Sequence, residues 1–185
     1  MKLYDFDRFN GFMRQSLNDL LFNDLWNHDI FNESDLHSAA YFYIRTFFQK
    51  NERPNIYVRC EPQLAGMKPD IVIYDQAKPI YAVEFKFFTK KDYVNEEGVF
   101  NDLAKLDKIV TRFNSMKWGF FYLVQDSEES YTFSNPSLRR HGYEKVSFST
   151  INLRRKEGTD RRRTNYDAWR AEFDKLVDLH REHSQ

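Results

Sequence analysis

The chain has 185 residues, enough for one domain with a substantial buried core. Its 28 basic and 28 acidic side chains give a net charge of zero, so the overall charge does not indicate binding to nucleic acid. The single cysteine, Cys60, excludes a disulfide framework, no apolar stretch approaches the roughly 20 residues of a membrane span, and acids stand too near the start for a secretory signal. We therefore expect one soluble, cytoplasmic domain over residues 1–185, with no membrane partner.

The first segment, residues 4–27, predicts a helix, because apolar side chains recur in it at intervals of three and four residues. Gly11 or Asn23 could interrupt this helix. Residues 1–35 carry seven acidic against three basic side chains, a net charge of −4, which makes the segment unsuited to lie on DNA. We interpret residues 1–31 as a helical extension that packs on the domain and carries no chemistry.

A second helix is expected from Asn32 to about Lys50. Asn32 is a good N-cap residue, with Asp35 three positions further on, and Glu33 lies in the first turn. The helix dipole alone favours acidic side chains at that end. We expect His37 to be a surface or packing residue of this helix rather than a ligand.

Three strands follow in the middle of the chain. A short strand is expected at residues 55–61, and a loop at 62–68 leads to two runs rich in β-branched and aromatic residues, 69–74 and 80–88. A polar segment that contains Pro79 separates these two runs, so they predict a β-hairpin.

The register of this hairpin would bring three charged side chains together. If Tyr74 pairs with Ile80, then Asp70 lies opposite Glu84, with Cβ atoms about 5 Å apart. Lys86 shares the face of Glu84, because side chains alternate along a strand. Two opposed carboxylates repel each other, so Lys86 and a divalent cation would have to compensate. Oxygen ligands at this spacing suit Mg²⁺ or Mn²⁺.

Pro69-Asp70, thirteen further residues, and then Glu84-Phe85-Lys86 form a pattern that resembles the motif of the PD-(D/E)XK nuclease superfamily, the restriction-endonuclease-like fold. The resemblance implies Mg²⁺- or Mn²⁺-dependent hydrolysis of phosphodiester bonds. It implies that Asp70 and Glu84 ligate the metal together with the backbone carbonyl of Phe85. Lys86 would orient or deprotonate the attacking water, or stabilise charge on the phosphate, with a depressed pKa where it acts as the base.

Many members of that superfamily carry a further Glu on the helix before the sheet, and Glu33 matches this position. The resemblance therefore implies a catalytic and metal-binding role for Glu33, directly or through water. Asp35 or Glu61 could complete the acidic site instead, and the sequence leaves this choice open.

The next helix is expected at about 99–113, with Asp102 and Lys105 on its polar face, where pairing at i,i+3 explains them as well as phosphate contact does. Residues 118–124 form a near-continuous apolar run, typical of a central strand covered on both faces. Together these elements predict an α/β fold with a central mixed sheet flanked by helices, in the order αβββαβ. The core that resembles the superfamily spans about residues 32–125.

Residues 126–185 add a basic segment and a C-terminal helix to this core. We expect a strand near 146–153 and an amphipathic helix after Asn165. Residues 139–163 carry nine basic against three acidic side chains, a net charge of +6. This segment is either an electrostatic footprint for the phosphate backbone or a solvated loop that offsets the acidic N-terminal segment.

The expected function is thus a metal-dependent nuclease, with DNA favoured over RNA as the nucleic-acid partner. One alternative is a nucleic-acid-binding module on the same fold that has lost catalysis. Another is a protein-interaction module, which the zero net charge and the acidic first helix favour. The sequence does not fix the oligomeric state and leaves both a homodimer and a protein partner open.

Overall fold

The computed structural model describes residues 3–27, 30, 32–89, 96–126 and 143–153. The chain divides into two compact units, Met1–Arg154 and Arg155–Gln185, and all described residues belong to the first. The helix expected after Asn165 lies outside the described residues, as does most of the basic segment 139–163.

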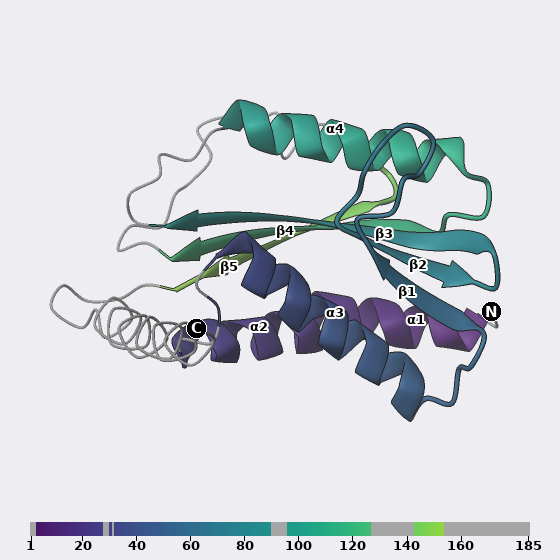
Figure 1. Ribbon diagram of the computed structural model, residues 1–185, viewed down its shortest axis with the longest axis horizontal. Coiled ribbons are helices and arrows are strands. Elements are labelled where there is room, and N and C mark those ends of the chain that lie inside the picture. Colours follow the sequence, from purple (N-terminus) through teal and green to yellow (C-terminus); the bar gives the residue numbers. More distant parts are fainter. Residues whose placement is uncertain (1–2, 28–29, 31, 90–95, 127–142, 154–185) are drawn as a thin grey trace, which may run out of the picture. The chain divides into compact units, whose positions relative to one another are not determined.

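Five strands form one mixed sheet whose spatial order follows the chain (Figure 1). The strands are β1 (Ile56–Cys60), β2 (Ile71–Asp75), β3 (Lys78–Thr89), β4 (Trp118–Asp126) and β5 (Val146–Asn152). β1, β2 and β3 pair in antiparallel fashion, whereas β3, β4 and β5 run parallel. The predicted α/β class, the mixed sheet and the order helix, three strands, helix, strand are confirmed.

Helices cover both faces of this sheet (Figure 1). They are α1 (Leu3–Gly11), the π-helix η1 (Phe12–Ser16), α2 (Leu17–Trp26), α3 (Glu33–Lys50) and α4 (Glu96–Arg112). α4 packs on one face, and the other helices pack on the opposite face. The interruption predicted near Gly11 is confirmed as a change from α- to π-helix, and α2 continues through Asn23. No helix among the described residues is long and apolar enough to cross a membrane.

The N-terminal helices supply part of the main core. Five of their side chains are fully buried: Phe9, Met13, Leu17, Leu21 and Leu25. The ring of Phe9 lies 4.6 Å from that of Tyr81 on β3, measured between centroids. The buried hydroxyl of Tyr122 on β4 donates a hydrogen bond to the carbonyl of Met13. Residues 3–26 are therefore integral to the packing of the sheet.

The β2–β3 hairpin has the predicted register only in its inner part. Val72 lies opposite Ala82, as predicted, but Tyr74 pairs with Pro79 rather than with Ile80. The register shifts by one residue between Ile73 and Tyr74, and a tight turn at Gln76 follows, where φ is +56°. The turn is thus shorter than predicted, while the pairs next to Asp70 and Glu84 are unaffected.

Candidate functional site

Glu84 is the most deeply buried of the charged residues predicted for the site. It lies on the face of β3 that α4 covers, and only 1% of it is exposed. Lys105 on α4 places its Nζ 2.8 Å from Glu84 Oε2, whereas Glu84 Oε1 has no hydrogen-bond partner among the described residues. Burial, together with the nearby charge of Asp70, raises the pKa of Glu84 to about 9 against the opposing effect of Lys105. Glu84 therefore carries a proton at neutral pH, and a further positive charge nearby would favour its ionisation.

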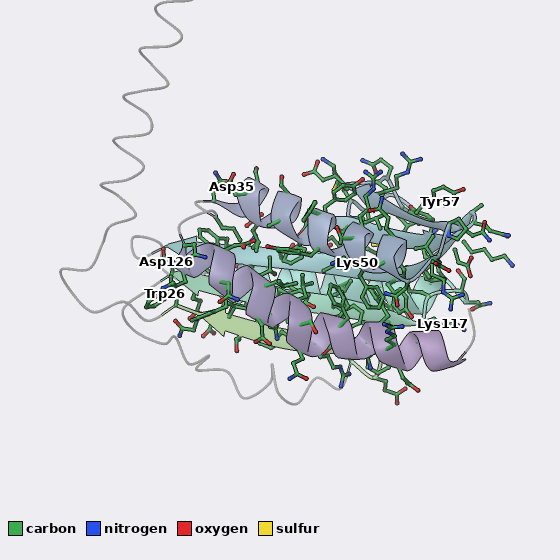
Figure 2. All side chains as sticks on the ribbon, turned by 90° about the horizontal axis from the view of Figure 1, so that it is seen from below. Trp26, Asp35, Lys50, Tyr57, Lys117 and Asp126 are labelled. Atoms are coloured by element: carbon green, nitrogen blue, oxygen red, sulfur yellow. The ribbon has the colours of Figure 1, made fainter. Side chains whose placement is uncertain are left out.

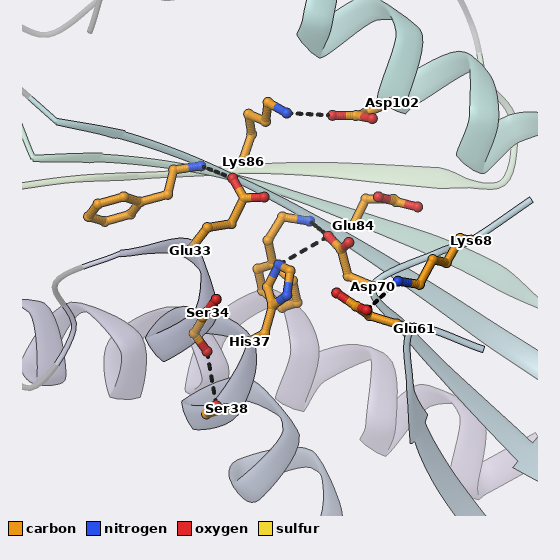
Figure 3. A network of polar contacts seen from close by, with 12 residues as sticks. Glu33, Ser34, His37, Ser38, Glu61, Lys68, Asp70, Glu84, Lys86 and Asp102 are labelled. Atoms are coloured by element: carbon orange, nitrogen blue, oxygen red, sulfur yellow. Dashed lines mark hydrogen bonds and ion pairs between the residues drawn. The ribbon is translucent and has the colours of Figure 1, made fainter. Parts of the chain in front are cut away.

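Asp70 immediately precedes β2, at the end of the β2–β3 ladder where Ile71 pairs with Val83. Its Oδ2 accepts a hydrogen bond of 2.7 Å from the backbone N–H of Phe85, and it lies 3.3 Å from His37 Nε2 on α3 (Figure 3). Burial raises the pKa of Asp70, but His37, the Phe85 N–H and Lys105 together outweigh burial and lower the pKa below its ordinary value. Asp70 is thus ionised at neutral pH.

Glu33, the first residue of α3, reaches the same edge of β3. Its Oε2 accepts a hydrogen bond of 3.3 Å from the backbone N–H of Phe87 (Figure 3). β3 continues past the end of its pairing with β2, which leaves the N–H groups of Phe85 and Phe87 without a strand partner there. Asp70 and Glu33 fill this gap, so each carboxylate also has a structural role as a cap of the strand edge.

Lys86 lies on the same face of β3 as Glu84 and points to α4. Its Nζ is 3.1 Å from Asp102 Oδ2, and Asp102 Oδ1 is 3.4 Å from Lys105. Burial lowers the pKa of Lys86, but the pairing with Asp102 outweighs burial and leaves the pKa above its ordinary value. The depressed pKa expected for Lys86 is therefore wrong in this arrangement, and Lys86 carries a positive charge at neutral pH.

Three residues of this network were not assigned to the site from the sequence: His37, Asp102 and Lys105. His37 packs on Phe85, as a packing residue would, with ring centroids 5.5 Å apart, but it also contacts Asp70. The spacing held a signal, since His37 follows Glu33 by four residues and so shares its helix face. Lys105 pairs with Asp102 at i,i+3, one of the two explanations that the sequence left open, and it reaches Glu84 as well.

The two other candidate acids have different surroundings. The backbone N–H of Asp35 donates to the Asn32 side chain over 2.9 Å, which confirms Asn32 as the N-cap of α3. Glu61 forms an ion pair with Lys68, and both side chains are about half exposed. The backbone N–H of Glu61 also donates to the carbonyl of Asp70 over 2.8 Å, so Glu61 adjoins the site through its main chain.

The donor set fits a divalent cation only in part. Among the described residues, no three His, Cys, Asp or Glu side chains gather closely enough to hold a metal ion. Mg²⁺ needs fewer protein ligands, because it binds through one or two carboxylates and completes its shell with water and substrate phosphate. Asp70 and the unpartnered oxygen of Glu84 meet that smaller requirement. A ligand set that includes Glu33 stays a prediction.

No protein-family model, curated protein or solved structure matches this chain.

Proposed function

We propose that the protein is a metal-dependent nuclease that hydrolyses phosphodiester bonds, with DNA favoured over RNA as its substrate, and that it has the restriction-endonuclease-like fold. The observation that carries the proposal is the pair formed by the buried carboxyl group of Glu84 and the partly buried carboxylate of Asp70. Glu84 keeps one oxygen without a partner among the described residues, beside a second carboxylate, Asp70, whose charge opposes ionisation of Glu84. Strongly shifted pKa values of this kind cluster at functional sites.

The order of elements supports the fold part of the proposal. α3, β1, β2, β3, α4 and β4 follow one another in the order that the PD-(D/E)XK resemblance implies. The Asp of the motif stands one residue before β2, and the Glu and Lys lie on β3, on the face that α4 covers. Glu33 begins the helix that precedes these strands.

Each residue of the site would have a separate role in hydrolysis. Asp70, Glu84 and the carbonyl of Phe85 would hold the cation, and the bound cation would polarise the scissile phosphate. The Phe85 N–H and His37 fix the orientation of Asp70. Lys86 is positively charged and held by Asp102, so it is suited to stabilise negative charge on the phosphate rather than to remove a proton.

Calorimetric titration of Mn²⁺ tests the metal site without knowledge of the substrate. We expect the wild type to bind and Asp70→Ala to lose binding, while Asp19→Ala, which removes an exposed carboxylate on α2, binds as the wild type does. Binding should also displace a proton from Glu84, so the measured heat should vary with the ionisation enthalpy of the buffer. Absence of binding by the wild type at millimolar Mn²⁺ would refute the metal site.

Cleavage assays then test the roles of the residues. Asp70→Ala and Lys86→Ala should each lower kcat by about 10²-fold or more, since the first removes a ligand of the cation and the second removes a positive charge that would stabilise the reacting phosphate. The far-UV circular dichroism of both variants should stay unchanged. Lys108→Ala, which removes an exposed lysine of α4, serves as the control. Full activity in either of the first two variants contradicts the assigned role.

The second candidate is a nucleic-acid-binding module on the same fold without catalysis. It is favoured by Lys105, which already supplies a positive charge to Glu84, and by the structural contacts of Asp70 and Glu33 with the edge of β3. This candidate predicts no metal binding but a steep loss of nucleic-acid affinity with salt. Binding of a protein partner with weak salt dependence would instead support an interaction module.

A further inference from the structure

A groove of about 680 Å³ lies between α3 and β1, away from the carboxylates. β1 is the first strand in the sheet order, so one of its edges has no strand neighbour among the described residues. The C-terminal half of α3 forms one wall, the turn after α3 closes the end, and β1 forms the other wall. The groove is therefore an open channel along the edge of the sheet.

The charge of this groove is strongly one-sided. Three exposed arginines line it, Arg45, Arg53 and Arg59, and Glu52 is the single acidic residue among its described lining. Charged side chains on an edge strand can serve to prevent aggregation, but either sign would do so. An excess of one sign instead fits a ligand that carries many negative charges.

Aromatic side chains accompany the arginines. Tyr57 on β1 is 50% exposed and lines the groove together with Tyr41 of α3. Arg45 Nη1 donates to the hydroxyl of Tyr41 over 3.3 Å, which joins a cation and a ring on one wall. Positive charge combined with exposed rings is the pattern that binds single-stranded nucleic acid, where unpaired bases can stack on aromatic side chains.

The groove continues the face of α3 that carries the candidate site. Glu33, His37, Tyr41 and Arg45 follow one another at intervals of four residues, which places them on one side of the helix. The first two reach β3 and Asp70, and the last two line the groove. From His37 to Arg45 the distance along the helix axis is about 12 Å.

We propose that this groove binds single-stranded nucleic acid and guides the strand to Asp70 and Glu84. The arginines would pair with phosphates, and the ring of Tyr57 would stack on a base. The residues of the groove alone support the binding step. Only the last step, delivery to the carboxylates, rests on the proposed nuclease function.

Fluorescence anisotropy with labelled oligo(dT) and oligo(rU), in the presence of EDTA, tests the binding step without any metal or cleavage. With three phosphates neutralised, log Kd should change with log salt with a slope of about 2 between about 50 and 200 mM. The double variant Arg45→Gln/Arg59→Gln should reduce that slope by more than half and weaken binding several-fold. Lys117→Gln removes one exposed charge that does not line the groove and should leave binding unchanged; Figure 2 shows Lys117 below Tyr57, at the same end of the molecule.

Tyr57 offers a matched pair of variants for the stacking contact. Tyr57→Ala should weaken binding about fivefold or more, whereas Tyr57→Phe keeps the ring and should bind as the wild type does. Unlabelled duplex should compete poorly, because its bases are not free to stack. Equal sensitivity of Tyr57→Phe and Tyr57→Ala would overturn the stacking contact.

The failures of the two proposals can be told apart. Asp70→Ala should bind oligonucleotide normally in EDTA, so loss of metal binding and cleavage leaves the groove proposal intact. Absence of wild-type binding at low salt, better binding of duplex, or binding that the arginine variants do not change would overturn the groove proposal. In the last case the channel would instead be free to take a peptide strand on the edge of β1.

Discussion

At the scale of single residues, the pair Asp70 and Glu84 determines the electrostatics of the site. Both are carboxylates, yet their environments move their pKa values in opposite directions. Asp70 has the Phe85 N–H and His37 as partners, whereas Glu84 has burial and the charge of Asp70 against it. A pair of titratable groups separated in this way is the arrangement that acid–base and metal sites use.

This separation predicts a pH-dependent stability. Glu84 has an unfolded pKa near 4.5 and a folded pKa of about 9, so the folded state holds a proton that the unfolded state has released in that window. The free energy of unfolding should therefore fall as the pH rises from about 5 to about 9. Glu84→Gln stays neutral at every pH. The unfolding free energy of this variant minus that of the wild type should therefore increase by a few kcal/mol between about pH 5 and about pH 9.

Urea unfolding at several pH values measures this difference. Glu97→Gln, which removes an exposed carboxylate on the same helix as Lys105, should show the pH dependence of the wild type. A difference between wild type and Glu84→Gln that does not change with pH would mean that Glu84 is not buried beside Asp70.

At the scale of the elements, α4 and β4 approach each other most closely at Gly119. A Cβ atom built on Gly119 would lie 2.9 Å from Leu106 Cγ and 3.0 Å from Val110 Cγ2. Both neighbours are buried side chains of α4. The helix therefore lies on the strand at a distance that only glycine permits, and this contact sets the position of Asp102 and Lys105 above β3.

Gly119→Ala should destabilise the fold by about 1–3 kcal/mol, because α4 must shift to accept the methyl group. Gly11→Ala is the matched control. Gly11 has helical φ and ψ of −61° and −44° and no atom within 4 Å of its built Cβ, so alanine there should be neutral or stabilise by up to about 1 kcal/mol. Chemical unfolding of both variants checks the pair, and equal effects would contradict the close approach.

The sequence predicted the elements well but not the contacts between layers. The Asn32 cap, the apolar stripes of the described helices and the hairpin pairs near Val72 follow from local patterns and are confirmed, whereas the helix after Asn165 stays a prediction. The register shift at Tyr74 was missed, because it depends on a left-handed backbone conformation at Gln76. Glycine is the usual sequence signal for that conformation, and this position has none.

The ion pairs of Glu84 with Lys105 and of Lys86 with Asp102 were missed for another reason. They depend on the height of α4 above the sheet, which periodicity does not contain. The same is true of the contact between His37 and Asp70, which joins α3 to the sheet. For the same reason the sequence alone could not give the pKa of Lys86.

At the scale of the whole unit, the N-terminal helices and the sheet share one core. Tyr122 on β4 and Met13 in η1 are 109 residues apart in sequence and are joined by a buried hydrogen bond. Burial also raises the pKa of Tyr122, so its hydroxyl stays a donor throughout the accessible pH range. This bond ties the first segment of the chain to a central strand.

Tyr122→Phe should cost about 1–3 kcal/mol of unfolding free energy, since it removes a buried donor and leaves the Met13 carbonyl without that bond. Tyr57→Phe, at an exposed position, should cost nothing measurable. Unfolding followed by circular dichroism and by tryptophan fluorescence should give coincident transitions in both variants, because helices and sheet share the core. Separate transitions would show that the N-terminal helices melt independently.

The same long-range packing has a consequence for synthesis on the ribosome. The apolar faces of α1, η1 and α2 emerge first, but their partners on β4 and β5 are translated about a hundred residues later. Until then the apolar, aromatic-rich face of these helices stays exposed, because the strands that bury it have not yet been synthesised. Early release or a pause before β4 should therefore leave this segment dependent on chaperones, and folding should complete only after β5 has left the exit tunnel.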